Sequence, residues 1–224
     1  MRPYVIINSA MSADGKLATR ERKQTKISGE QDFQRVEKLR AESDAVMVGI
    51  GTIFSDDPSL RLKKDESAKK RRAEGKAEHP MRVVVDSLAR MPLDSDMFRK
   101  GTGRVVVFVS KKAELENVRA LSEKADVIYA GEDFVDLEIV LDKLGKMGVK
   151  QLMVEGGATL LWSFMSRRLF DEIRIYVGAL IIGGKDAPTF SDGEGFIDPN
   201  DFTKLNLKSV DKIDDGVLLT WTRR

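Results

Sequence analysis

The chain has 224 residues, of which 42% are hydrophobic and 33% charged, a composition typical of a globular protein with a densely charged surface. Its 38 basic residues nearly balance 36 acidic ones, so the net charge of +2 provides no overall field for binding nucleic acid or an anionic membrane. With no cysteine and a single histidine, the sequence excludes disulfides, thiolate catalysis and multi-histidine or cysteine zinc sites, and we predict no metal.

Apolar runs alternate with helically spaced segments along most of the chain. The apolar and β-branched runs predict strands at 4–8, 45–50, 82–85, 105–109, 125–129 and 151–154. Helical spacing predicts helices at 33–40, 113–124, 135–146 and 158–165. The last part is strand-like at 172–176, 179–182, 205–213 and 217–222, with a turn at 214–216.

This order predicts a single α/β domain over residues 1–224, built on a mixed, mostly parallel sheet flanked by helices, with antiparallel strands at the C-terminus. The segment 63–78 is low in complexity and predicts a solvated loop or helix, with a basic flap over a phosphate-bearing ligand as the alternative. It interleaves acidic residues and contains no aromatic side chain, which argues against nucleic-acid binding. No apolar run could span a bilayer and the N-terminus lacks a signal peptide, so we expect a cytoplasmic protein.

Two polar motifs follow the first two predicted strands. Ser12, Asp14 and Lys16 lie in an Asp-Gly turn that could hold a polar substrate, with an ordinary turn as the alternative. The segment 49–52 (Gly-Ile-Gly-Thr) allows close backbone approach to a ligand, and Thr52 could cap a helix or bind a phosphate. It lacks the third glycine of the Rossmann fingerprint. Asp56 precedes Asp57 and Pro58, which predicts an extended or turn conformation.

Two further motifs end central strands. The residues at the ends of two neighbouring strands, with a lysine pair at 111–112, could bind an adenosine phosphate and favour NADPH; these residues are Val85, Asp86, Ser87 and Ser110. Plain helix starts are the alternative. The segment 155–159 (Glu-Gly-Gly-Ala-Thr) opens a helix after an apolar strand, and free amides at that helix N-terminus suit a pyrophosphate. Glu155 would then face a hydroxyl-bearing substrate, because it is unfavourable beside an anion.

Taken in order and spacing, five segments resemble the riboflavin-biosynthesis reductase family: Asn8, 12–16, 49–52, 56–60 and 154–157. The resemblance covers nearly the whole chain. It implies a dihydrofolate-reductase-like fold, a homodimer, and the use of NADPH, or of NADH as the alternative. It also implies reduction of a ribosylamino-pyrimidine phosphate to the ribitylamino compound.

The resemblance also implies roles for particular residues. Thr52 and Asp56 would contact the cofactor, and its phosphates would lie on Gly156, Gly157, Ala158 and Thr159. Substrate contacts would come from Asn8, Ser12, Asp14, Lys16, Ser28, Leu60, Lys63 and Glu155. Lys63 stands where bacterial members have arginine, so it keeps the charge without the bidentate fork. Asp56 is the first candidate for ring opening or proton delivery, and Glu155 the second.

A stand-alone reductase suits the order in which reduction precedes deamination, so we expect 2,5-diamino-6-ribosylamino-4(3H)-pyrimidinone 5′-phosphate as the substrate. Three alternatives stay open: the deaminated pyrimidine, dihydrofolate, and a non-catalytic dinucleotide-binding module. For these residues to act together, the ends of the central strands must form one crevice.

Overall fold

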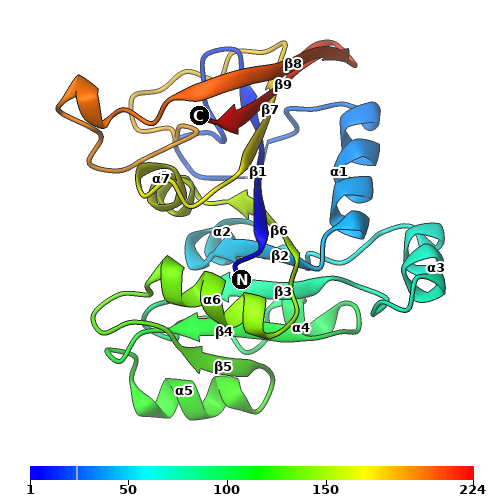
Figure 1. Cartoon of the computed structure of the whole chain (residues 1–224), viewed down its shortest axis with the longest axis vertical. Helices are drawn as coiled ribbons and strands as arrows, with labels where there is room; N and C mark the ends of the chain where they lie inside the picture. The colour runs from blue at the N-terminus through cyan, green and yellow to red at the C-terminus, as the bar shows by residue number, and fades with distance from the viewer. Residues whose placement is uncertain (24) are drawn as a thin grey trace. The chain divides into compact units, whose positions relative to one another are not determined.

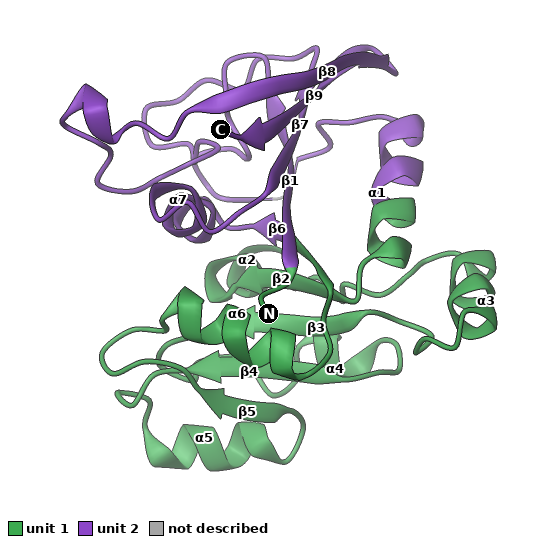
Figure 2. Ribbon diagram, viewed as in Figure 1, with its two compact units in different colours: residues 1–3, 37–153 green, residues 4–36, 154–224 purple. Residues whose placement is uncertain are grey.

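A computed structural model describes residues 1–23 and 25–224. Its strands form a mixed sheet in the order β5-β4-β3-β2-β6-β1-β7-β9-β8 (Figure 1). The chain divides into two compact units, drawn in Figure 2: unit 1 comprises residues 1–3 and 37–153, and unit 2 residues 4–36 and 154–224. Strand β6 (Gln151–Gly156) and helix α1 (Glu30–Glu42) each contribute residues to both units.

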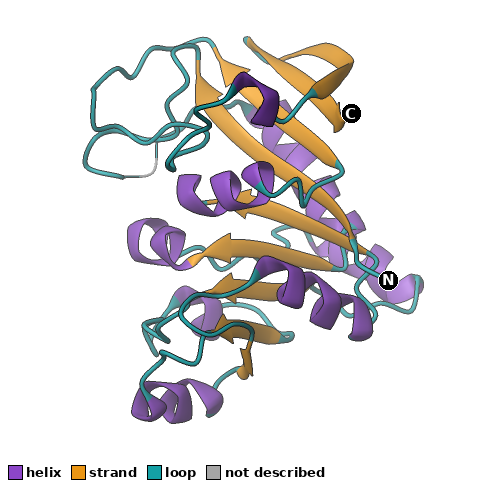
Figure 3. Ribbon diagram, turned by 60° about the vertical axis from the view of Figure 1, so that its left-hand side comes forward, coloured by secondary structure: helices purple, strands orange, loops and turns teal. Residues whose placement is uncertain are grey.

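Unit 1 contains four parallel strands: β2 (Ala45–Gly49), β3 (Met81–Val85), β4 (Val105–Val109) and β5 (Asp126–Tyr129). All five residues of β4 are buried, as expected for a valine-rich strand covered on both faces. Unit 1 also contains the helices α2 (Ile50–Asp56), α3 (Asp65–Ala73), α4 (Asp96–Arg99), α5 (Leu115–Ser122) and α6 (Leu137–Lys146). Figure 3 shows the strands of the protein in orange with helices in purple beside them. The register pairs Gly49 with Val85, so β2 and β3 end at the same edge.

Unit 2 is mixed in strand direction. Strand β1 (Tyr4–Ser12) runs parallel to β7 (Glu172–Gly178), and β7, β9 (Gly216–Arg223) and β8 (Leu205–Ile213) are successively antiparallel. Helix α7 (Ala158–Ser166) follows β6, and a short 3₁₀ helix, η1, spans Pro199–Asp201. Tyr176, Leu218 and Ile27 form a buried cluster in this unit. The predicted mixed sheet with antiparallel C-terminal strands is therefore confirmed.

Two local predictions are wrong. The segment 179–182 is a loop, because its polar backbone groups bond to the turn after β1 instead of to a strand: Leu180 accepts from the Ala13 amide, and Ile182 donates to Asp14. Asp56 is the last residue of α2, not part of an extended segment. Pro58 restricts the residue directly before it, and that residue, Asp57, leaves the helix in the left-handed region at φ 40°.

The charged segment 63–78 is largely helical rather than a loop. Helix α3 exposes most of its residues, but Arg71 is buried and donates to the carbonyl oxygens of Ala41 at 2.8 Å, Ser43 at 2.7 Å and Ala77 at 2.8 Å. Arg71 therefore anchors the helix to the chain that enters β2. No helix in the described part of the chain is long and apolar enough to cross a membrane.

Candidate active site

Unit 1 gathers its predicted cofactor-binding residues at the carboxyl edge of its parallel strands. Thr52 and Asp56 lie on α2, directly after β2. Val85, Asp86 and Ser87 end or follow β3, and Ser110 follows β4. The strand register brings these segments side by side, so this part of the sequence prediction describes one edge of a sheet.

Asp56 is the carboxyl group at this edge that is best suited to acid catalysis. Desolvation raises its pKa above the usual value, and a hydrogen bond with Ser55 opposes that rise. Asp56 is nevertheless exposed to solvent, so a ligand can reach its carboxyl group. A carboxyl group with a raised pKa is better able to deliver a proton near neutral pH than an ordinary aspartate.

The other predicted polar residues at this edge shape the loops. Asp86 is fully buried, and its carboxylate accepts hydrogen bonds from the amides of Arg90 and Met91. The Ser110 hydroxyl donates to the carbonyl of Ser87 at 2.8 Å, and the Ser87 hydroxyl accepts from an amide at 3.0 Å. These side chains therefore hold the strand-end loops in place, and their contact with a cofactor stays a prediction.

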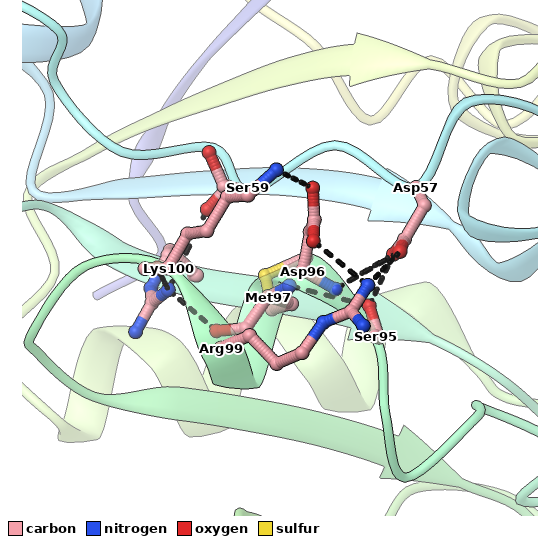
Figure 4. A network of polar contacts seen from close by, with 8 residues as sticks. Asp57, Ser59, Ser95, Asp96, Met97, Arg99 and Lys100 are labelled. Atoms are coloured by element: carbon pink, nitrogen blue, oxygen red, sulfur yellow. Dashed lines mark hydrogen bonds and ion pairs between the residues drawn. The ribbon is translucent and has the colours of Figure 1, made fainter.

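A network of polar contacts fixes the chain that follows Asp56 (Figure 4). The Asp57 carboxylate accepts from the Ser95 hydroxyl at 2.5 Å and from the Asp96 amide at 3.0 Å. Arg82, only 2% exposed, donates to four carbonyl oxygens, those of Ser59, Met97, Lys100 and Gly103. Burial lowers its pKa. Sequence reasoning missed Arg82, although an arginine inside an apolar strand was a signal that it must find buried partners.

The predicted substrate residues of unit 1 lie on the next segment. Leu60 is buried with a positive φ of 51°, so its side chain belongs to the core. Lys63 is exposed, and its amide donates to the Glu37 carboxylate at 2.9 Å. The Leu62 amide donates to Nδ1 of His79 at 3.2 Å, which requires the neutral form of this buried histidine. Burial lowers the pKa of His79, in keeping with that role.

In unit 2, the turn after β1 is tied to the long loop after β7. The Asp14 carboxylate accepts from the Ser12 hydroxyl at 2.5 Å and from the amides of Ile182 and Gly183. These hydrogen bonds lower the pKa of Asp14 to about 2. The Lys16 ammonium donates to the carbonyl of Ala187 at 3.2 Å. These hydrogen bonds therefore hold the turn in one conformation and position the half-buried Lys16.

The residues predicted to hold phosphates open helix α7. Gly156 and Gly157 have φ of 137° and 67°, conformations that favour glycine. No side chain caps the helix, and its first turn contains no acidic residue. The backbone amides at the start of this nine-residue helix can therefore donate hydrogen bonds to an anionic group. Ala158 is buried and Thr159 exposed, while Glu155 is half-buried and engaged in contacts of its own.

Two further predicted substrate residues of unit 2 are buried. Asn8 lies on β1, and its Oδ1 has no hydrogen-bond partner in the described part of the chain. Ser28 is buried beside Ile27. An unsatisfied buried oxygen is costly, so Oδ1 of Asn8 suits a hydrogen-bond donor from a ligand. The predicted residues are thus distributed over both units, and their meeting in one crevice stays a prediction.

This arrangement defines an α/β protein whose polar groups follow the carboxyl ends of parallel strands. The chain belongs to the family described as the RibD C-terminal domain, whose model matches residues 3–219. This confirms the resemblance inferred from the ordered motifs.

The chain is similar to named relatives over nearly its full length. It is 46% identical to the 2,5-diamino-6-ribosylamino-4(3H)-pyrimidinone 5′-phosphate reductase of Archaeoglobus fulgidus, over 98% of both chains. It is 41% identical to the protein of the same name from Methanothermobacter thermautotrophicus, over 99% of both. Among solved structures, a pyrimidine reductase-like protein from Corynebacterium diphtheriae matches with a TM-score of 0.83 and 17% identity, covering 99% of this chain and 92% of that one. The last match shows a shared fold.

Proposed function

We propose that this protein is a reductase that converts 2,5-diamino-6-ribosylamino-4(3H)-pyrimidinone 5′-phosphate to the ribitylamino compound in riboflavin biosynthesis. The observation that carries the proposal is the 46% identity, over 98% of both chains, to a relative named for this substrate. The two archaeal relatives align with this chain over 98% and 99% of their own length, so neither carries a separate deaminase domain, which supports reduction before deamination.

The cofactor of this proposal is NADPH, with NADH as the alternative. When bound, its nicotinamide supplies the hydride that reduces the substrate. The uncapped start of α7 supports phosphate binding by the amides of Gly156, Gly157, Ala158 and Thr159. Thr52 and Asp56 would contact the cofactor from α2, together with Val85, Asp86, Ser87 and Ser110 at the adjoining strand ends. The latter contacts would use backbone groups, because the side chains of Asp86 and Ser110 are occupied.

The substrate would be held by charge and by hydroxyl contacts. Lys16 and Lys63 would neutralise its phosphate, and Glu155 would accept hydrogen bonds from its sugar hydroxyls. Ser12 and Asp14 shape the turn that positions Lys16. Asn8 would accept a hydrogen bond through its unsatisfied Oδ1, while Ser28 and the backbone of Leu60 would contact the same ligand.

The chemistry requires an opened ribose and one proton. Opening the sugar exposes an imine or aldehyde-like carbon at C1′, which accepts the hydride, and the chain must orient this carbon and exclude water. Asp56 would deliver the proton, because desolvation raises the pKa of its carboxyl group. Glu155 is the second candidate for that role.

Two remaining expectations belong with this proposal. We propose a homodimer, for which sedimentation of the purified protein is the direct test. A cytoplasmic location also stays a prediction.

A side-by-side assay tests the proposed function. Purified protein is given NADPH with the diamino substrate, its deaminated counterpart or dihydrofolate, and cofactor consumption is followed. We expect fast consumption with the diamino substrate and a ribitylamino product identified by mass spectrometry. Preference for either other substrate would assign a different reduction. Cofactor binding without turnover of any of the three would leave a non-catalytic dinucleotide-binding module.

A further inference from the structure

Two exposed side chains meet at the strand edge of unit 1. Arg90 follows β3, and Phe54 lies on α2, which follows the neighbouring strand β2. The guanidinium carbon of Arg90 lies 5.7 Å from the centroid of the Phe54 ring. The Arg90 side chain is 46% exposed and Phe54 is 54% exposed. The pair therefore presents an aromatic ring and a cation to solvent beside Thr52 and Asp56.

Asp86 fixes the orientation of the Arg90 side chain. The buried Asp86 carboxylate accepts from the backbone amide of Arg90, from the Met91 amide at 2.8 Å, and from Nε of Arg90 at 3.3 Å. The two terminal nitrogens of Arg90 have no hydrogen-bond partner in residues 1–23 and 25–224. The guanidinium group is thus held at its Nε atom, and its two terminal nitrogens are available to donate hydrogen bonds to an anion.

The lysines that follow β4 differ from Arg90 in this respect. Lys111 forms an ion pair with Glu132 at 2.7 Å, and Lys112 pairs with Asp133 at 3.4 Å. Both carboxylates are exposed and lie on the loop after β5, so each lysine has a surface counter-ion of its own. Arg90 is instead paired with a buried carboxylate that is also engaged by two backbone amides. Arg90 is therefore a better candidate than the lysine pair for an anion that arrives with a ligand.

We propose that Arg90 binds the 2′-phosphate of NADPH and that Phe54 stacks on its adenine, so that Arg90 determines the preference for NADPH over NADH. This inference rests on the proposed function, since it assumes a nicotinamide dinucleotide as the cofactor. A planar guanidinium fork matches a phosphate bidentately, and NADH carries only a hydroxyl at that position. The adenine is common to both cofactors, so Phe54 contributes to the affinity for both.

Direct binding measurements test the proposal independently of turnover. The Kd values of NADPH and NADH are measured by calorimetry for the wild-type chain and for Arg90→Gln. We expect Arg90→Gln to weaken NADPH binding about 10- to 100-fold and to change NADH binding less than about twofold, because one charge-assisted contact is lost. Arg119→Gln, which removes an exposed arginine from α5, serves as the matched control and should change neither Kd.

Two more variants separate binding from structure. Arg90→Lys keeps the charge without the fork and should weaken NADPH binding by an intermediate factor, which keeps the test informative if Arg90→Gln folds poorly. Phe54→Leu should weaken both cofactors by similar factors. Equal loss of NADPH and NADH binding in the arginine variants, or no loss of either, would overturn the proposal. Wild-type protein that binds NADH as tightly as NADPH would overturn it as well.

The outcomes also distinguish this inference from the proposed function. If the wild-type chain reduces the diamino substrate but its cofactor preference is unchanged by Arg90→Gln, the inference fails and the function stands. If no substrate is reduced but Arg90→Gln selectively weakens NADPH binding, the function fails and the assignment of Arg90 stands.

Discussion

The carboxylate of Asp14 accepts the amide hydrogen of Gly183 at 2.7 Å. This bond joins the turn after β1 to the loop after β7, two motifs that lie 169 residues apart in the sequence. Because the Asp14 carboxylate also accepts from Ser12 and Ile182, its ionised form is what holds the two loops together.

The stability contributed by Asp14 should depend on pH. Its pKa is lowered from 3.8 to about 2 in the folded protein, so the ionised carboxylate stabilises the fold above pH 3.8, and this contribution is lost as the pH falls toward 2. We expect Asp14→Asn to lower Tm at neutral pH. The Tm difference between the variant and the wild type should shrink as the pH falls from 3.8 toward 2. Asp186→Asn, a nearby exposed aspartate on the partner loop, is the control. A constant Tm difference across this range would contradict the account.

Arg71 should be important for stability and not for catalysis. Arg71→Met leaves three carbonyl oxygens without their donors, and we expect a loss of about 2–4 kcal/mol in the free energy of unfolding. Arg72→Met, on the exposed side of α3, should change it by less than about 0.5 kcal/mol. Urea denaturation of both variants checks the difference. Similar values for the two would show that α3 is not anchored through Arg71.

Gly156 should be required for cofactor binding. In Gly156→Ala the new Cβ meets no protein atom within 4 Å, but φ of 137° strains the backbone by about 1–3 kcal/mol. We expect NADPH binding to weaken at least about tenfold, because the amides at the start of α7 shift. Gly75→Ala is the matched control, since Gly75 also has open space and a positive φ of 73°. It should lower Tm and leave the Kd unchanged; equal Kd values for both variants would count against phosphate binding at Gly156.

Asp56 should affect turnover more than affinity. We expect Asp56→Asn to lower kcat about 100-fold or more while the Kd of NADPH changes little, because a proton donor acts in the chemical step. The pKa of Asp56 is raised, so wild-type kcat should fall as the pH rises through that pKa. The kcat of the variant should not show this decrease. Asp94→Asn, an exposed aspartate of unit 1, should leave kcat unchanged. A variant that retains wild-type kcat would remove Asp56 from the chemistry.

The sheet could be predicted from the sequence because its strands carry strong local signals. The run Val105–Val109 is β-branched and bounded by polar residues, and β4 has the same bounds. Helix α2 was missed since it has seven residues and contains Gly51, a residue that disfavours helices. The C-terminal hairpin was found because its turn at Asp214 and Asp215 separates two long strand patterns.

The site could be predicted only in part, since motifs identify residues but not their partners. Thr52 and Asp56 follow a strand, and the structure places them at the expected edge. Arg82 binds carbonyl groups 15, 18 and 21 residues further along the chain, which no local pattern encodes. The contact between Phe54 and Arg90 likewise depends on the pairing of β2 with β3.

The most direct test of the proposed reduction follows the hydride itself. The purified chain is incubated with the diamino substrate and NADPH that carries deuterium at both hydrogen positions of the nicotinamide C4, and the product is analysed by mass spectrometry and NMR. The account predicts a ribitylamino product with one deuterium at C1′. Consumption of the labelled cofactor with no deuterium at C1′, or a substrate recovered unchanged, would contradict it.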